Sequence, residues 1–153
     1  MDHTDAIVEL KNIVDPQLVS KVVPLINKKA KHKLKLAEVV DTSIRNVNGY
    51  SLTFKLSSDM ISQIELLKYD IGGKYEVHVD QYTGGPRHLS VIINLNDDYE
   101  GGDLIFTGQK NEEIKRLKLG KRSVVFFPSN FMYPHRIEPI TKGTRYSIVA
   151  WLQ

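Results

Sequence analysis

The feature that most constrains the fold is a series of short hydrophobic runs that fills the second half of the chain. The runs are rich in β-branched and aromatic residues, several alternate with period two, and turns containing glycine, proline or polar residues separate them. They cover residues 49–56, 65–70, 74–80, 89–96, 102–108, 114–119, 123–129 and 144–153. About eight short strands with such turns predict a β-sandwich or jelly roll.

Helical patterns are confined to the N-terminal part of the chain. Residues 16–31 begin with Asp15 as an N-cap and Pro16 at the first helical position, and apolar residues recur at helical spacing. A second short helix is expected from the capping signal at residues 57–59 to about Gln63. We therefore expect a mainly β chain with N-terminal helices that pack outside one sheet.

Length and composition limit the class of protein. The 153 residues, 41% of them hydrophobic, can bury one core but are too few for two ordinary domains. Cysteine is absent, which excludes disulfides and a thiolate metal site, so any metal must be held by His, Asp or Glu. The N-terminal residues lack a secretory-signal pattern and no apolar run approaches membrane-spanning length, so the expected location is the cytoplasm.

A basic cluster at residues 27–35 raises the isoelectric point to about 9.0, although the net charge is only +3. A nucleic-acid-binding patch is one interpretation of this cluster. The preferred interpretation is a solvated helix end whose lysines complement the helix dipole.

His78 and Asp80 are two positions apart inside a strand-like run. Alternation along a strand sends both side chains to the same face, where both can reach one metal ion. Taken alone, the pair fits equally an ordinary hydrogen bond between the imidazole and the carboxylate.

His135 adds a second imidazole near the end of a strand-like segment. Two imidazoles and one carboxylate can occupy one face of an octahedron, which leaves three positions for a chelating cosubstrate and dioxygen and suits Fe(II). His88 is the rival third ligand. The acidic turn at residues 97–100 is a rival source of the carboxylate, but it is interpreted as a solvated hairpin loop.

Arg145 and Ser147 share one face of the last strand with Val149 and Trp151. A guanidinium group binds a carboxylate with two parallel hydrogen bonds, and a neighbouring hydroxyl can add a third. An arginine that points into the barrel needs a buried anion, so a bound dicarboxylate is expected. The alternative is an exposed Arg145 with Ser147 incidental.

Five motifs follow one another in the second half of the chain. They are Y-x-x-G-x-x-Y-x-x-H-x-D at residues 69–80, R-x-L-S-x-x-x-x-L-N at 87–96, Y-E-G-G-D-L-x-F at 99–106, G-K-x-x-V-x-F-F-P-S at 120–129 and H-x-x-x-P-x-x-x-G-x-R-Y-S at 135–147. In this order they resemble the iron(II)- and 2-oxoglutarate-dependent oxygenases of the prolyl 4-hydroxylase-like group. The resemblance covers about residues 64–153.

The resemblance implies a double-stranded β-helix in which His78, Asp80 and His135 bind Fe(II). It also implies one oxygenase domain over residues 1–153, with helical support and the first strands in residues 1–63 and the catalytic core in residues 64–153.

The same resemblance implies that Arg145 holds the distal carboxylate of 2-oxoglutarate, with help from Ser147 and Tyr69, and that O2 is the second cosubstrate. Animal and plant prolyl 4-hydroxylases commonly carry lysine in place of Arg145 and threonine in place of Leu104. The pairing of arginine with Ser147 is closer to bacterial and phage-type members.

The implied reaction is hydroxylation of an unactivated C–H bond, in the first place that of a peptidyl proline. Tyr75 and Arg87 match positions that contact the peptide in the family, although strict alternation would send Tyr75 to the face opposite His78 unless a turn or bulge redirects it. A peptide or protein substrate is therefore expected. Nucleic acid and membrane are not, because the dense basic cluster lies outside the resembling part.

Three alternatives stay open at this point. The first is the same oxygenase chemistry on a free amino acid or another small molecule. The second is a zinc-dependent jelly-roll hydrolase or isomerase with the same three ligands. The third is a binding module without catalysis, in which His78 and Asp80 are structural.

Overall fold

The computed structural model describes residues 2–27 and 61–153 of the chain. Within these ranges two helical segments precede most of the strands. The helical segments are the 3-10 helix η1 (His3–Ala6) and α1 (Pro16–Asn27). The strands are β1 (Val8–Leu10), β2 (Ile61–Tyr69), β3 (Tyr75–His78), β4 (Leu89–Asn94), β5 (Glu100–Gly101), β6 (Leu104–Thr107), β7 (Glu113–Leu117), β8 (Ser123–Pro128), β9 (His135–Ile137), β10 (Ile140–Lys142) and β11 (Arg145–Leu152).

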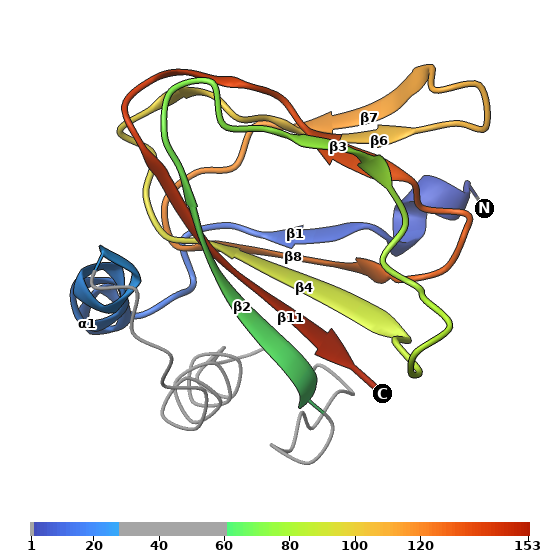
Figure 1. Ribbon diagram of the computed structural model, residues 1–153, viewed down its shortest axis with the longest axis horizontal. Coiled ribbons are helices and arrows are strands. Elements are labelled where there is room, and N and C mark those ends of the chain that lie inside the picture. Colours follow the sequence, from blue (N-terminus) through green and yellow to red (C-terminus); the bar gives the residue numbers. More distant parts are fainter. Residues whose placement is uncertain (1, 28–60) are drawn as a thin grey trace.

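The strands form two main sheets that face each other. The larger sheet has the order β1-β8-β4-β11-β2 and the smaller has the order β3-β9-β6-β7, and neighbouring strands in both are antiparallel. A short ladder of β5 and β10 adds a third pairing. Figure 1 shows the larger sheet below the smaller one, with α1 at the left. The predicted mainly β jelly roll is confirmed.

Alternation along β11 divides its side chains between two hydrophobic clusters. Ile148 and Ala150 pack with the apolar face of α1, whereas Val149 and Trp151 face the second sheet. β4 and β8 repeat this division. The N-terminal helix therefore covers the outer face of the larger sheet, as expected, and the inner face is free to carry the polar residues of a site.

The expected short helix that ends near Gln63 is wrong for the part that is described, because residues 61–63 begin β2. The reason is long-range pairing: β2 pairs with β11 along its whole length, from Ile61 opposite Leu152 to Tyr69 opposite Arg145. This pairing overrides the local capping signal. The strand expected at residues 49–56 and most of the basic cluster lie outside the described residues.

α1 ends at Asn27, so the last four residues of the helix expected over 16–31 also lie outside the described part. The helix contains Pro24, as the sequence requires. Neither described range contains a helix with the length and hydropathy needed to cross a membrane.

A glycine turn joins β2 to β3 and so sets the direction in which β3 enters the site. Gly72 has φ of +83°, a conformation that only glycine adopts without steric cost. A Cβ on Gly73 would lie 2.8 Å from the carbonyl oxygen of Asp70. The Gly72 amide donates to the Ile140 carbonyl at 2.8 Å, which ties the turn to β10.

Candidate active site

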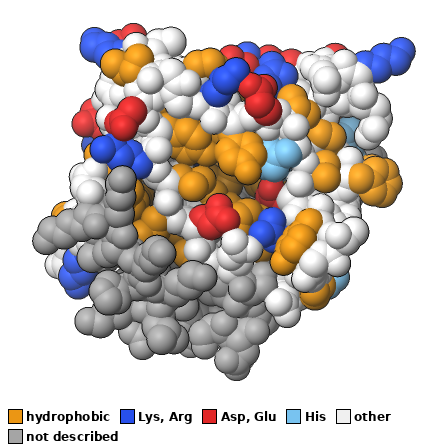
Figure 2. Space-filling model, in the orientation of Figure 1, with side chains coloured by type: hydrophobic (Ala, Val, Ile, Leu, Met, Phe, Trp, Pro, Cys, Tyr) orange, Lys and Arg blue, Asp and Glu red, His pale blue; other side chains and the backbone are white. Residues whose placement is uncertain are grey.

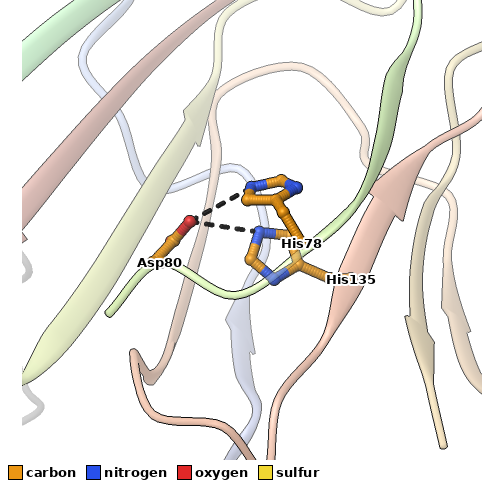
Figure 3. A group of neighbouring side chains, drawn as sticks. All are labelled: His78, Asp80 and His135. Atoms are coloured by element: carbon orange, nitrogen blue, oxygen red, sulfur yellow. Dashed lines mark ion pairs between the residues drawn. The ribbon is translucent and has the colours of Figure 1, made fainter. Parts of the chain in front are cut away.

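His78, Asp80 and His135 point toward one another between the two sheets (Figure 3). Nε2 of His78 lies 3.2 Å from Oδ1 of Asp80, and Nε2 of His135 lies 3.6 Å from the same oxygen. One ligand atom from each residue lies within 4.8 Å of the others, and no other such group of three occurs in residues 2–27 and 61–153. The structure brings together the three residues that the sequence singled out.

The two histidines are cross-strand neighbours. β9 pairs with β3 so that His135 stands opposite His78, and the two ring centroids are 4.3 Å apart. β3 ends at His78, and Asp80 lies in a bend beyond it. The expected shared side of His78 and Asp80 is found, although the strand itself stops at His78 and Asp80 lies beyond it.

Both histidines present the same ring nitrogen to the centre. Nδ1 of His78 lies 2.8 Å from the Glu76 carbonyl oxygen, and Nδ1 of His135 lies 3.0 Å from the Tyr133 carbonyl oxygen. A carbonyl oxygen only accepts hydrogen bonds, so each Nδ1 carries a proton, and in the neutral ring each Nε2 keeps its lone pair. This is the arrangement that a metal-binding imidazole needs.

The electrostatics keep the carboxylate charged. Burial works to raise the pKa of Asp80, but the hydrogen bond with His78, the charge of His135 and the hydrogen bonds of Ser90 and Trp151 hold it well below its usual range. Asp80 is therefore an anion at neutral pH. The oxygens of its carboxylate face two imidazoles and the Ser90 hydroxyl, and its negative charge suits this group to a cation.

The pKa values of the two imidazoles are shifted in opposite directions. Burial opposes charge on His78, but the hydrogen bond to Asp80 and the carbonyl of Glu76 raise its pKa above the ordinary value. His135 is almost completely buried, and this burial lowers its pKa despite the attraction of Asp80. His135 is thus the neutral ligand at physiological pH, and His78 is the one whose proton competes with a metal.

Two serines that sequence reasoning missed complete the surroundings of Asp80. Oγ of Ser90 donates to Oδ2 of Asp80 at 2.6 Å, and Oγ of Ser129 lies 2.7 Å from Oγ of Ser90. All three residues are buried. The available signal was a serine inside the hydrophobic run of residues 89–96, at a position that alternates onto the inner face.

Arg145 and Ser147 lie on the inner face of β11, as predicted, and both are buried. Nε of Arg145 donates to Oδ1 of Asn94 at 3.0 Å, whereas Nη2 of Arg145 and Oγ of Ser147 are buried without a hydrogen-bond partner. In the described part of the chain no carboxylate lies within ion-pair distance of Arg145. Buried donors of this kind are costly unless a ligand satisfies them, so the pair fits a carboxylate-bearing cosubstrate.

Tyr69 stands opposite Arg145 on β2, and the guanidinium carbon lies 5.2 Å from the centroid of its ring. Burial raises the pKa of Tyr69 above its ordinary value, with the charge of Arg145 acting against the shift. The phenol therefore stays protonated and can donate to an anion beside Arg145.

One pocket of about 330 Å³ contains both groups, because its lining includes the two histidines and Asp80 as well as Arg145, Ser147 and Tyr69. Its remaining walls are largely apolar and include Ile92 and Val149. Figure 2 shows a face whose centre is hydrophobic, with a histidine and acidic and basic side chains around it. The arrangement provides a metal-binding end and a carboxylate-binding end in one pocket.

Tyr75 lies at the rim of this pocket, and its ring is stacked near that of His78 with centroids 4.3 Å apart. The pairing of β3 with β9 shifts register between Tyr75 and His78. This irregularity is the bulge that the sequence required to bring both side chains to one side, and it leaves Tyr75 47% exposed.

Arg87 also lines the pocket, but its side chain is already engaged. Its guanidinium carbon lies 4.4 Å from the ring centroid of Tyr82 and 3.8 Å from that of Trp151. Its terminal nitrogens donate to the Asp80 carbonyl at 3.1 Å and to Gln63 Oε1 at 2.5 Å. Arg87 therefore links the loop after Asp80 to β2 and β11.

The rival ligands lie elsewhere. His88 is exposed and does not belong to the group of three, and its backbone amide donates to Leu152. In the acidic turn, Asp98 accepts from Asn96 at 2.6 Å and Glu100 pairs with Lys142 at 3.2 Å. This turn is the solvated loop that was expected.

Comparison with known proteins agrees with the part of the chain that carries these groups. Residues 64–153 match the family model of the 2OG-Fe(II) oxygenase superfamily. A PKHD-type hydroxylase of Gloeothece citriformis (strain PCC 7424) is 36% identical over 92 residues, which are 56% of this chain and 40% of that protein. The chain spans about half the length of the curated relatives it matches.

The fold is similar to those of two solved prolyl hydroxylases. A Pseudomonas putida prolyl-4-hydroxylase matches with a TM-score of 0.69 and 17% identity, over 97% of this chain and 84% of that one. A Trichoplax adhaerens prolyl hydroxylase, solved with a peptide fragment of the hypoxia inducible factor oxygen degradation domain, matches with a TM-score of 0.68 and 19% identity over the same shares. These likenesses concern the fold.

Proposed function

The chain belongs to the 2OG-Fe(II) oxygenase superfamily, and on this basis we propose that it is a dioxygenase that uses Fe(II), 2-oxoglutarate and O2 to hydroxylate an unactivated C–H bond. One observation carries the proposal. A group of two imidazoles and one carboxylate shares a pocket with a buried arginine that has a nitrogen without a partner. The first group suits iron and the second suits a carboxylate.

His78, Asp80 and His135 would hold the iron through Nε2, Oδ1 and Nε2. The hydrogen bonds from each Nδ1 to a backbone carbonyl fix the rings in the tautomer that leaves Nε2 available. When bound, Fe(II) and 2-oxoglutarate supply with O2 an oxidative decarboxylation that yields succinate and carbon dioxide and delivers one oxygen atom to the substrate C–H bond. The residues of the chain supply position, charge and exclusion of water.

Arg145 would bind the distal carboxylate of 2-oxoglutarate through Nη2, with Ser147 and Tyr69 as further donors. The bond from Nε to Asn94 fixes the plane of the guanidinium, so that Nη2 stays directed at the ligand. The charges of iron, Asp80, the 2-oxoglutarate dianion and Arg145 nearly cancel. The assembled site can therefore be buried without a large electrostatic cost.

For the substrate we propose a peptidyl proline. Support comes from the two prolyl hydroxylases of similar fold, one of them solved with a peptide, and from the hydroxylase name of the curated relative described above. Tyr75, exposed beside His78, and Arg87 both line the pocket and would meet the peptide there. We further propose that residues 64–153 carry the catalytic site and residues 1–63 support it. Location in the cytoplasm stays a prediction.

The alternatives make different demands on Arg145. A zinc hydrolase or a binding module has no need of a buried guanidinium with an unsatisfied nitrogen, whereas a 2-oxoglutarate enzyme does. The same chemistry on a free amino acid or another small molecule remains the second candidate. It is favoured by the modest pocket volume of about 330 Å³.

The test of the substrate is a mass measurement. Proline-containing peptides and matched peptides with alanine in place of proline are incubated with the protein, Fe(II), 2-oxoglutarate and O2. We expect a gain of one oxygen atom in the proline peptides only, reduced in Tyr75→Phe while slow succinate release without peptide persists. Arg87→Ala should reduce the gain as well, and metal content is measured beside it because Arg87 donates to the Asp80 carbonyl. If only free amino acids or methylated oligonucleotides stimulated turnover, the prolyl assignment would fall and the oxygenase class would stand.

A further inference from the structure

Asp80 is the one member of the metal-binding group that no strand holds. His78 ends β3 and His135 begins β9, so ladder hydrogen bonds fix their backbones. Asp80 lies in the bend beyond β3. Its position therefore depends on contacts from other parts of the chain, and those contacts decide which carboxylate oxygen faces the histidines.

The two oxygens of Asp80 have different partners. Oδ1 is the oxygen that faces Nε2 of both histidines, at 3.2 and 3.6 Å. Oδ2 accepts from the Ser90 hydroxyl at 2.6 Å, a short charge-assisted hydrogen bond, and Trp151 is a further donor to the carboxylate. Because an ionised carboxylate only accepts, the single hydroxyl proton of Ser90 is committed to Oδ2.

Ser129 completes a directed chain of hydrogen bonds. Its Oγ lies 2.7 Å from Oγ of Ser90, and since Ser90 has already used its proton, Ser129 must be the donor. Ser129 is itself fixed by its backbone: its amide donates to His88 at 3.1 Å, and its carbonyl accepts from Gln81 at 2.8 Å. Ser129 thus holds the residue after Asp80 directly and the Asp80 carboxylate through Ser90.

We propose that Ser90 and Ser129 are positioning residues that make Asp80 present a single oxygen to the metal. The inference rests on the proposed function. Two imidazoles and one oxygen leave three octahedral positions open, whereas a carboxylate that turned both oxygens to the metal would occupy one of them. The Ser90 hydroxyl prevents this by binding Oδ2, and donation from Ser129 polarises that hydroxyl and strengthens the bond.

The experiment measures Mn²⁺ binding to the metal-free protein by the loss of the free-ion paramagnetic resonance signal. Removal of a residue that supports a metal ligand typically costs about 10- to 100-fold in metal affinity. We expect a loss of this size in Ser90→Ala and a smaller loss in Ser129→Ala. At saturating Mn²⁺, 2-oxoglutarate should also bind Ser90→Ala more weakly, because the freed Oδ2 competes for a position that 2-oxoglutarate needs.

The double variant decides whether the two serines act in series. If Ser129 acts through Ser90, the Ser90→Ala/Ser129→Ala protein loses no more affinity than Ser90→Ala alone, whereas independent contributions would add. Ser90→Thr, which keeps a hydroxyl, should restore much of the affinity. Ser123→Ala removes a similarly buried serine of the same sheet that does not contact the metal-binding group, and it should bind Mn²⁺ like the wild type.

The outcomes separate the inference from the proposed function. A wild type that binds no Mn²⁺ overturns the proposed function and the inference with it. A wild type that binds, with unchanged affinity in Ser90→Ala, overturns the inference alone. If Ser90→Ala fails to fold, the Ser129→Ala protein decides in the same way, and additive losses in the double variant overturn the serial arrangement.

Discussion

Nε of Arg145 donates to Oδ1 of Asn94 at 3.0 Å, in a pair of side chains that is completely buried. The amide of Asn94 cannot turn, because its Nδ2 donates to the carbonyls of Leu119 and Gly120 at 3.2 and 3.1 Å. Asn94 therefore orients the guanidinium, and Nη2 of Arg145 is left buried without a hydrogen-bond partner among the described residues.

This relationship predicts that Asn94→Ala raises the 2-oxoglutarate requirement although Asn94 is not a proposed ligand. A hydrogen bond to a charged group contributes roughly 1.5 to 3 kcal/mol, which corresponds to about 10- to 100-fold. Binding of 2-oxoglutarate to the Mn²⁺-loaded protein measures the effect, and Mn²⁺ affinity is the internal control. A variant with wild-type affinity for both would show that Arg145 needs no orientation from Asn94.

Arg145→Ala should have a larger effect of the same kind. We expect the apparent 2-oxoglutarate requirement to rise by one to a few orders of magnitude, because charge-assisted bonds of roughly 1.5 to 3 kcal/mol each are lost. Ser147→Ala should show a smaller increase. Metal binding should be nearly intact in both variants, and an unchanged requirement in Arg145→Ala would mean that the carboxylate binds elsewhere.

Removal of a metal ligand should abolish metal binding and turnover together. His135→Ala takes away the buried neutral imidazole, and His78→Ala and Asp80→Ala take away the other two donors. His88→Ala is the matched control, since this histidine is exposed and outside the group. Metal content after reconstitution is the readout, and full iron content in His135→Ala would contradict the ligand set.

Metal affinity should fall as the pH is lowered, and His78 should be the first of the two histidine ligands to become protonated. The hydrogen bonds with Asp80 and the Glu76 carbonyl raise the pKa of His78 above its ordinary value despite burial, so protons compete at its Nε2 as the pH falls through that pKa, and affinity drops by up to tenfold per unit. Asp80 stays ionised in this range, and His135, whose pKa is lowered by burial, takes up a second proton only at lower pH. Mn²⁺ titrations between about pH 5.5 and 8 check this. An affinity independent of pH over that interval would contradict it.

The aromatic packing behind His135 should contribute strongly to stability. Phe127 is completely buried, and its ring centroid lies 4.8 Å from that of His135 and 5.0 Å from that of Phe106. Phe127→Ala should lower the free energy of unfolding of the metal-free protein by about 3 to 5 kcal/mol. Phe131→Ala, at a residue 67% exposed, should change it by less than about 0.5 kcal/mol. Denaturant unfolding measures both, and equal effects would contradict the packing described.

Several strands could be predicted because they are nearly continuous hydrophobic runs, which is the pattern of strands buried on both faces. β4, β8 and β11 are of this kind, and each lies within a run recognised in the sequence. β1, β5, β9 and β10 were not predicted as strands, because two or three residues are too few to establish a period. They exist through pairing with distant strands, which local sequence does not report.

Some residues of the candidate site could likewise be predicted from the sequence, and others could not. His78, Asp80, His135 and Arg145 were found because their residue types are diagnostic of metal and carboxylate binding. Ser90 and Ser129 stand in the quoted motifs but were given no role, and Asn94 was not singled out, because a serine or an asparagine is not by its residue type diagnostic of a site. Their roles follow from the tertiary contacts that bring residues 80, 90 and 129 together.

The central claim, that the chain couples 2-oxoglutarate oxidation to iron at this site, is tested most directly by succinate release. Wild-type protein loaded anaerobically with Fe(II) and then supplied with 2-oxoglutarate and O2 should form succinate, and His135→Ala and Arg145→Ala should not at the same 2-oxoglutarate concentration, while His88→Ala should match the wild type. Succinate formation that survives in His135→Ala, or that never occurs in iron-loaded wild type with any substrate offered, would contradict the account.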